Sequence, residues 1–373
     1  MSWIITSDQV NPPGDAAITY GITNAGGVFN LRSTGTVDYE VEWGDGNVEI
    51  STLNTLPHTY AAGNHTLAVY SDSVYRPYSV NVTADATQIT SVVIGSGADL
   101  GTNLQSAWYG ASNMTSFVCP FDVTSGVTNF FATWYNCSDL TSFPQIDTSS
   151  GTNFNSGWRD CSSLTSFPQI DTSSGINFSH TWFNCSNLTS FPQINTSSGT
   201  SFDIAWFNCN SLTSFPLIDT SSGTSFGSTW RNCFSLTSFR SIDTSSGTSF
   251  VGCWRNCYSL TSFPLIDTSS GTSFHTAWYG CSSLADFPAN MFDTTGTLAT
   301  NAFAGAFALC ALTAQSIENI LVSLDTNGAT GITLGIGGVN NAHTSTWSAA
   351  ANAAWLSLDA KGWDITQNGP DPT

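Results

Sequence analysis

The sequence has little charge of either sign. Asp, Glu, Lys and Arg together make up 9% of its 373 residues, against roughly a quarter in an ordinary globular domain. Lys and Arg number only 7 while Asp and Glu number 26, which gives a formal net charge of −19. So few cations cannot neutralise a run of phosphates, so the composition argues against binding to nucleic acid. The excess of negative charge likewise argues against an anionic membrane surface.

The sequence also lacks long apolar runs, and its first residues are not predicted to form a signal peptide. No stretch of about 18 apolar residues occurs that would span a bilayer, so we expect no membrane insertion. The segment from Met1 to Asp8 has neither the basic region nor the apolar core of a signal peptide. This pattern favours assembly inside a cell and exposure on a particle such as a virion, or an export signal that is absent from this sequence.

Catalytic motifs are lacking too. The 5 histidines show no spacing with a carboxylate or nucleophile, and there is no GxSxG, HExxH or phosphate-binding loop. Glycoside hydrolysis needs two carboxylates at a defined separation, and Asp residues repeated in identical turns provide no unique pair. We therefore predict that the chain is not an enzyme and that it needs no cofactor.

What the sequence does contain is a repeat. Tryptophan recurs every 24 residues from Trp134 to Trp278, and Trp108 precedes this series by 26 residues. A fixed period of about 20 to 50 residues indicates a solenoid. From Trp134 on, Cys follows each Trp by three residues, which predicts two columns of core residues: Trp134, Trp158, Trp182, Trp206, Trp230, Trp254 and Trp278, and Cys137, Cys161, Cys185, Cys209, Cys233, Cys257 and Cys281.

Each 24-residue unit, or coil, has its own internal pattern. Phe154, Trp158 and Cys161 lie at i, i+4 and i+7, which is one face of about two helical turns. Leu164 and Phe167 then follow an extended course into an Asp-Thr-Ser-Ser-Gly turn. We therefore predict coils of a short helix, a short strand and a turn, which must stack to bury their apolar faces. The predicted fold class is an α+β repeat solenoid of about nine leucine-rich-like coils over residues 86–310.

The repeat resembles the leucine-rich repeats of BspA-like surface proteins and of mycoplasma lipoproteins, whose unit reads approximately DTSNVTNMxxMFxxCxxLTSL. The matching stretch from Asp147 to Phe167 reads DTSSGTNFNSGWRDCSSLTSF. Here Trp replaces Met-Phe and Gly replaces Val, and the resemblance extends over residues 89–310. It implies a leucine-rich solenoid on a surface and, more loosely, adhesion, and it identifies no ligand.

Residues 1–85 carry no repeat and are predicted to form a small β-sandwich. Gly44-Asp45-Gly46 predicts a turn, and His58 to Val69 predicts a second, hairpin-like stretch. The residues Trp-Gly-Asp-Gly, followed by His-Thr-Tyr and Gly-x-x-Thr-Leu-x-Val, resemble PKD-type immunoglobulin-like domains, which implies a spacer or attachment module. A half-buried strand is indicated by the alternating residues Val37, Tyr39, Val41 and Trp43.

Residues 311–373 are predicted to form an α/β cap, because the end of a stack exposes its core unless it is covered. Just before this segment, Phe303, Phe307 and Cys310 repeat the Phe/Trp/Cys spacing. Helices are predicted around Ile317–Leu324 and Trp347–Leu358, the latter closed by Gly362, with a strand at Ile332–Ile336. The segment is similar to C-terminal segments of tailed-phage structural proteins, through Ile317-Glu-Asn-Ile-Leu and Lys361-Gly-Trp363.

The 10 cysteines raise the question of disulfides or metal. In-register neighbours in a stack project parallel to one another, which is poor disulfide geometry, and no CxxC pair or His partner indicates a metal site. We predict buried thiols that act as small hydrophobic residues. Cys253 is out of register and is predicted to be the most exposed thiol.

Aspartate also recurs once per coil. Stacked carboxylates repel, and a calcium ion would relieve that repulsion. Alternatively, each Asp accepts a hydrogen bond from its own turn, which is the interpretation that we favour. The residues concerned are Asp147, Asp171, Asp219, Asp243 and Asp267, with Asn195 interrupting the series.

One position varies against this constant framework. The residue after each Trp points about 100° away from the core stripe on a helix, so these residues form a row on one flank. Such a row of rings and arginines can stack on sugars or anchor proteins; alternatively it covers the seam between coils, with arginine stems packed on ring faces. We call this set the flank column: Tyr135, Arg159, Phe183, Phe207, Arg231, Arg255 and Tyr279.

A second variable row lies on the predicted strands. Inner sheet faces are the usual ligand surfaces of leucine-rich folds, which is an argument by analogy. This second row comprises Gln145, Gln169, Gln193, Leu217, Ser241 and Leu265.

Together these features predict a non-enzymatic virion-exposed protein, such as a phage fibre, receptor-binding or capsid decoration protein. Its N-terminal domain would attach to other virion or surface proteins, and its solenoid would face a host glycan or protein receptor. The alternatives are a bacterial cell-surface adhesin and a structural spacer or capsid-stabilising protein without ligand. The ligand, the anchored end and homo-oligomerisation stay open.

Overall fold

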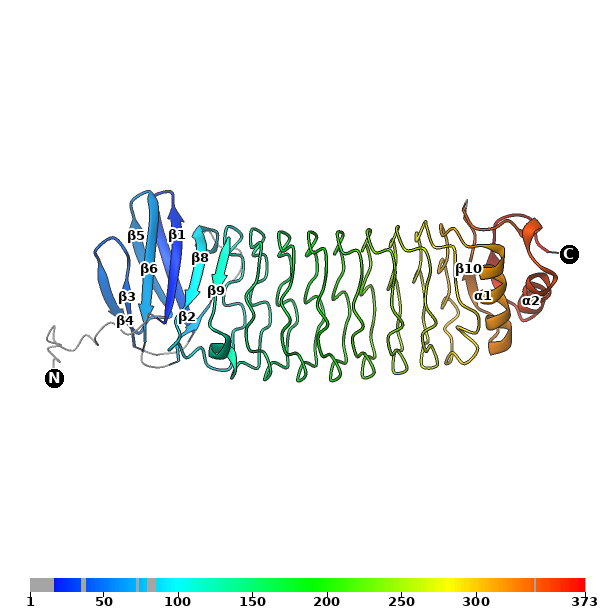
Figure 1. Cartoon of the computed structure of the whole chain (residues 1–373), viewed down its shortest axis with the longest axis horizontal. Coiled ribbons are helices and arrows are strands. Elements are labelled where there is room, and N and C mark those ends of the chain that lie inside the picture. The colour runs from blue at the N-terminus through cyan, green and yellow to red at the C-terminus, as the bar shows by residue number, and fades with distance from the viewer. Residues whose placement is uncertain (1–16, 35–37, 72–73, 79–84, 339, 373) are drawn as a thin grey trace.

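The structure is a computed structural model that describes residues 17–34, 38–71, 74–78, 85–338 and 340–372. Figure 1 shows an elongated molecule in which a block of strands is followed by a row of parallel coils and then by helices at the far end. The buried apolar residues form one continuous core from Ala17 to Trp363.

The N-terminal block consists of two sheets. The order of strands is β4-β3-β6-β1-β8-β9 in the first sheet and β5-β2-β7 in the second, where β8 is Ile89–Ile94 and β9 is Ser116–Val118. Alternate residues of β1 and β2 are buried, so each sheet turns one face to the core. The strands of this block are β1 (Ile18–Asn24), β2 (Gly27–Thr34), β3 (Tyr39–Glu42), β4 (Val48–Ser51), β5 (Thr55–Tyr60), β6 (Gly63–Tyr70) and β7 (Arg76–Pro77).

The prediction of a hairpin-like stretch from His58 to Val69 is wrong. β5 pairs with β2, while β6 pairs with β1 and β3, so the chain changes sheet between them. The reason is the packing of Tyr60, whose ring is perpendicular to that of Trp43 at 6.2 Å and whose hydroxyl donates to the Trp43 carbonyl. Facing sheets bury both rings, whereas a flat hairpin would leave one face of each in water. Val37, part of the predicted alternating strand, lies outside the described residues.

The block and the coils share a sheet. A short 3₁₀ helix, Ala86–Gln88, leads into β8 (Ile89–Ile94), which pairs antiparallel with β1 and parallel with β9 (Ser116–Val118). The predicted boundary at residue 85 is therefore crossed by backbone hydrogen bonds. A second 3₁₀ helix, Phe121–Thr124, closes the first irregular coils.

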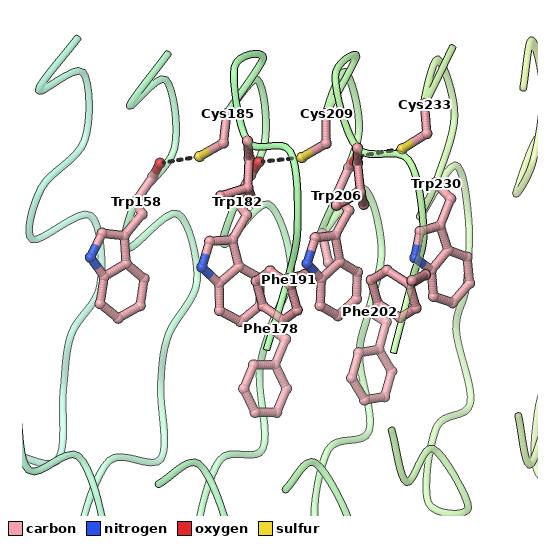
Figure 2. Close-up of a cluster of buried hydrophobic side chains, with 14 of the residues drawn as sticks. Trp158, Phe178, Trp182, Cys185, Phe191, Phe202, Trp206, Cys209, Trp230 and Cys233 are labelled. Carbon is pink, nitrogen blue, oxygen red and sulfur yellow. Dashed lines mark hydrogen bonds between the residues drawn. The ribbon is translucent and has the colours of Figure 1, made fainter. Parts of the chain in front are cut away.

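The coils stack at the period of the sequence. Parallel bridges join Asn129 to Asn153, Asn153 to Asn177, and onward to Ser273. The ring centroids of neighbouring tryptophans from Trp108 to Trp278 lie between 5.1 and 6.0 Å apart and the rings are nearly parallel. Figure 2 shows Trp158, Trp182, Trp206 and Trp230 in a row, with the cysteines on one side and Phe178 and Phe202 on the other. Stacked aromatic rings gain energy beyond the burial of their area.

The predicted helix and strand of each coil are wrong, because residues 125–313 form only turns and isolated bridges. The Trp158 amide donates to the Thr181 carbonyl of the next coil, whereas the Arg159 amide donates to Ser156 within its own coil. Alternate amides thus leave the coil, and the i→i−4 bonds of a helix cannot form. Ser156 (φ 57°) and Asp160 (φ 61°) are left-handed, as are the equivalent residues around the other tryptophans.

The Asp-Thr-Ser-Ser-Gly turn is fixed by its threonine and glycine. The Thr172 side chain is buried and donates to the Asn195 carbonyl of the next coil, and its equivalents repeat this contact. A Cβ at Gly175 would overlap the ring of Phe178. Glycine is therefore needed here for close packing against the phenylalanine column.

The C-terminal cap contains α1 (Ala314–Asn327), β10 (Thr333–Gly335), a 3₁₀ helix (Thr344–Thr346), α2 (Ala349–Ala360) and β11 (Asp364–Thr366). Thr313 and Ser348 cap the two α-helices by accepting backbone amides. Phe303 stacks on Phe274 at 5.1 Å, and Phe307 takes the tryptophan position against Trp278 at 5.0 Å. In the described ranges no helix is long and apolar enough to cross a membrane.

Candidate functional site

The flank column is one continuous row of half-buried side chains in the structure. Each member follows a buried tryptophan and precedes a left-handed residue, so the chain turns its side chain away from the core. Tyr109 extends the column, since its ring stacks on that of Tyr135 at 4.4 Å. The sequence analysis missed Tyr109, although Trp108-Tyr109 is the same dipeptide as Trp134-Tyr135.

Neighbouring members of the column pack face to face. The Arg159 guanidinium carbon lies 5.2 Å from the Tyr135 ring centroid and 4.4 Å from that of Phe183. The rings of Phe183 and Phe207 stack at 5.0 Å. These contacts are the seam-covering packing that was one of the two interpretations, and every member of the column remains partly exposed.

The three arginines of the column differ in their partners. The Nε atom of Arg159 lies 3.4 Å from a carboxylate oxygen of Asp160. Arg231 lies over the Phe207 ring at 5.4 Å and Arg255 over the Tyr279 ring at 4.6 Å. Within the part of the chain that the structure describes, neither has an ion-pair partner, and the buried Nε atom of each lacks a hydrogen-bond acceptor. Burial, and then the charge of Arg255, lower the pKa of Arg231.

The second row is more exposed than the flank column. All six of its members are exposed, with Leu217 at 47% and Leu265 at 53%. The Ser241 hydroxyl is directed along the row and donates to the Leu265 carbonyl at 2.7 Å. The row thus offers separated polar and apolar side chains, without the mutual stacking of the flank column.

The cysteine column is a structural device. In coil after coil, the buried thiol donates to the tryptophan carbonyl of the preceding coil at 3.1 to 3.3 Å, as Cys209 does to Trp182 (Figure 2). These thiols are therefore hydrogen-bond donors as well as small hydrophobic residues. Burial raises the pKa of Cys209 to about 12.

The prediction that Cys253 is the most exposed thiol is wrong, because its side chain is completely buried. Cys253 directly precedes Trp254, at a position that other coils fill with the buried residues Thr181 and Ala205. This position points into the core because the residue before it is left-handed, as Gly252 is here (φ 62°). All 10 cysteines of the chain are buried free thiols.

The aspartates bond to their own turns, which confirms the turn interpretation. In each turn a carboxylate or amide oxygen accepts the amide of the serine two residues on, at 2.8 to 3.1 Å. Hydrogen bonds from Ser173 and Ser245 lower the pKa of Asp171 and of Asp243, respectively. The described residues contain no group of three or more His, Cys, Asp or Glu side chains arranged to hold a metal ion.

Comparison with known proteins identifies no relative from which a role of the flank column could be transferred. No protein-family model matches the chain, and a search of curated proteins finds no match to it.

Proposed function

We propose that the chain is a non-enzymatic structural and adhesion protein of a virion surface, which presents the flank column to a host glycan or protein receptor. The observation that carries the proposal is the flank column itself. It places half-exposed rings and guanidiniums side by side on the surface of the solenoid. Aromatic and arginine side chains are those that recognition surfaces favour.

The variation between coils supports the same proposal. The core position of every regular coil is Trp, while the next position changes among Tyr, Arg and Phe. Stacking alone would be satisfied by one repeated ring, as the tryptophan column demonstrates. A varied sequence of groups along an extended surface is what a specific ligand requires.

The connection between the N-terminal block and the coils supports a role on a virion particle. Because the N-terminal sheet continues into the first coils, a partner held by the N-terminal block would be coupled to the stack through backbone hydrogen bonds. Free buried thiols suit folding in a reducing compartment, where virion proteins are assembled. The resemblance to BspA-like surface repeats points to adhesion as well, and a bacterial cell-surface adhesin is the alternative setting.

A structural spacer without ligand is the second candidate. It is favoured by the mutual packing of the flank column, since rings and guanidiniums that stack on one another already have a stabilising role. The two candidates differ in one measurable property, which is whether the surface binds anything.

A glycan array separates the two. The wild-type protein is compared with Arg159→Ala/Arg231→Ala in the flank column and with Gln169→Ala/Gln193→Ala in the second row. We expect binding by the wild type and by the second-row variant, and loss of binding in the arginine variant. Circular dichroism checks that both variants are folded. An array on which the arginine variant binds like the wild type would eliminate the flank column as the site.

A separate experiment tests whether the protein belongs to a virion or to a bacterial surface. Mass spectrometry of purified particles is expected to find this chain at fixed stoichiometry with other virion proteins. If the protein is recovered from a bacterial envelope fraction and not from particles, the virion location is wrong and the bacterial cell-surface adhesin is supported.

A further inference from the structure

We propose that the part of the flank column formed by Arg231 and Arg255, which we call the step, is an anion subsite that binds the carboxylate of an acidic sugar. This deepens the proposed function and rests on it, since it names the chemical class of ligand for part of the same column.

The two arginines carry adjacent, uncompensated charges. They occupy consecutive coils, and the spacing of those coils is given by the 5.9 Å between the rings of Trp230 and Trp254. Arg159, the third arginine, has Asp160 beside it, whereas no described carboxylate pairs with Arg231 or Arg255. In a chain of net charge −19, two neighbouring cations left without a partner call for an external anion.

Their hydrogen-bonding capacity is also unused. The Nε atoms of both residues are buried and lack an acceptor among the described residues. The planar guanidinium presents its donors as a fork that matches a carboxylate. The rings of Phe207 and Tyr279 lie under the two guanidinium groups and fix their planes.

The positions beside this step carry small side chains or none. The second residue before each tryptophan lies beside the flank column, since the His180 ring is 6.2 Å from that of Phe183. Beside Arg231 and Arg255 this residue is Ser228 and Gly252, in place of the bulkier His180 and Ile204 of earlier coils.

Gly252 lies between two hydroxyl groups. A Cβ placed on Gly252 would be 3.1 Å from Ser228 Oγ and 3.8 Å from Thr276 Oγ1. A carboxylate held by the arginines would therefore have two hydroxyls next to the ring that carries it, which suits a sugar.

The test uses the full chain and two readouts. The first is an array on which each glycan appears with and without a terminal sialic or uronic acid, at fixed ionic strength. The second is the melting temperature in sodium glucuronate compared with glucose plus sodium chloride. The variants are Arg231→Gln/Arg255→Gln at the subsite and, as the control, Arg240→Gln, an exposed arginine outside the column.

We expect the wild type and Arg240→Gln to prefer acidic glycans and to melt at a higher temperature in glucuronate. In Arg231→Gln/Arg255→Gln the preference should fall by about tenfold, because two charge-assisted contacts are lost, and glucuronate should no longer raise the melting temperature. Gly252→Asn keeps both charges and tolerates a positive φ, but places a side chain over the step and should weaken acidic binding as well.

The outcomes separate this inference from the proposed function. Glycan binding that is equal for acidic and neutral forms, or unchanged in Arg231→Gln/Arg255→Gln, overturns the anion subsite and leaves the proposed function standing. Stabilisation by glucuronate that persists in that variant places the anion elsewhere and also overturns the subsite. An array without any binding, together with subsite-dependent stabilisation by glucuronate, overturns the receptor function while supporting the subsite.

Discussion

The core columns and the flank column occupy adjacent positions in every coil, yet they follow opposite rules. The tryptophans are identical from coil to coil and fully buried, whereas the residues that follow them alternate among Tyr, Phe and Arg and are half-buried. A closed interior at native packing density accepts one side chain per position, since a different shape would leave a void. At the half-exposed position a guanidinium can replace a ring, because its stem packs on the neighbouring ring while its charge stays solvated.

Removing one member of each column tests whether the buried tryptophans contribute more to stability than the half-buried flank residues. Trp206→Ala should lower the free energy of unfolding by about 3–5 kcal/mol, since it opens a cavity between Trp182 and Trp230. Phe207→Ala, one residue on, should cost clearly less because Phe207 is only half-buried. Guanidinium chloride denaturation measures both.

Trp206→Phe is the matched control for that experiment. Phe307 already fills the tryptophan position of the last coil and stacks on Trp278, so the phenylalanine variant should retain most of the stability. Equal losses in Trp206→Ala and Phe207→Ala would show that burial does not distinguish the two columns.

The buried thiols should make the core sensitive to alkali. The pKa of Cys209 is raised from 9.0 to about 12 by burial, so the folded protein binds a proton that the unfolded chain releases. The contribution of Cys209 to stability is therefore fully present below pH 9 and is lost as the pH rises toward 12, by about 1.4 kcal/mol per pH unit. Denaturation of wild type and Cys209→Ala between pH 8 and 11 should give a shallower decline for the variant; parallel curves would contradict this.

Backbone strain beside the flank column offers a stabilising change. Ile204 has φ 59°, a conformation that is costly for a β-branched residue and that Asn tolerates better. Ile204→Asn should raise the free energy of unfolding by about 1 kcal/mol. Ile176→Thr is the control, because Ile176 is exposed with an ordinary backbone and the neighbouring coils carry Thr there. A loss of stability in Ile204→Asn would mean that its apolar contacts outweigh the strain.

The smallest predicted difference lies within the flank column. Arg159→Met removes contacts with two rings and with Asp160, and should cost about 0.5–1 kcal/mol. Arg231→Met also relieves the repulsion from Arg255, so its effect should be close to zero or slightly stabilising. Melting temperatures measured at low and high salt should show the difference shrinking with salt; equal losses in both variants would argue that the two arginines are not repelling one another.

Several of these features could be predicted from the residues and others could not. The 24-residue period predicted which residues meet, and the rings of Trp134 and Trp158 do stack. The i, i+4, i+7 spacing of Phe154, Trp158 and Cys161 predicted burial correctly but a helix wrongly, because a tight run of turns can bury the same residues. The signal against a helix was present in the Asn, Asp or Gly that follows every flank residue, such as Asn184 (φ 59°).

Some features of the flank column could likewise be predicted from the sequence, and others could not. Its members were identified from their variation within the repeat, but which arginines have partners depends on neighbouring coils. Asp160 lies beside Arg159 in the sequence, so that pair could have been anticipated. The isolation of Arg231 and Arg255, and the hydroxyls around Gly252, depend on contacts between residues about a coil apart.

By itself the sequence determined the register of the stack, because identical side chains at a constant interval can only be buried against their own copies. It also determined that the turns bond internally, since Asp and Ser two residues apart suffice for that contact. Only the tertiary structure decided the path of the backbone within each coil, because alternate amides around each tryptophan bond to the neighbouring coil and so depend on the presence of that coil. It also decided the direction of each thiol, since the acceptor of Cys209 is a carbonyl 27 residues away.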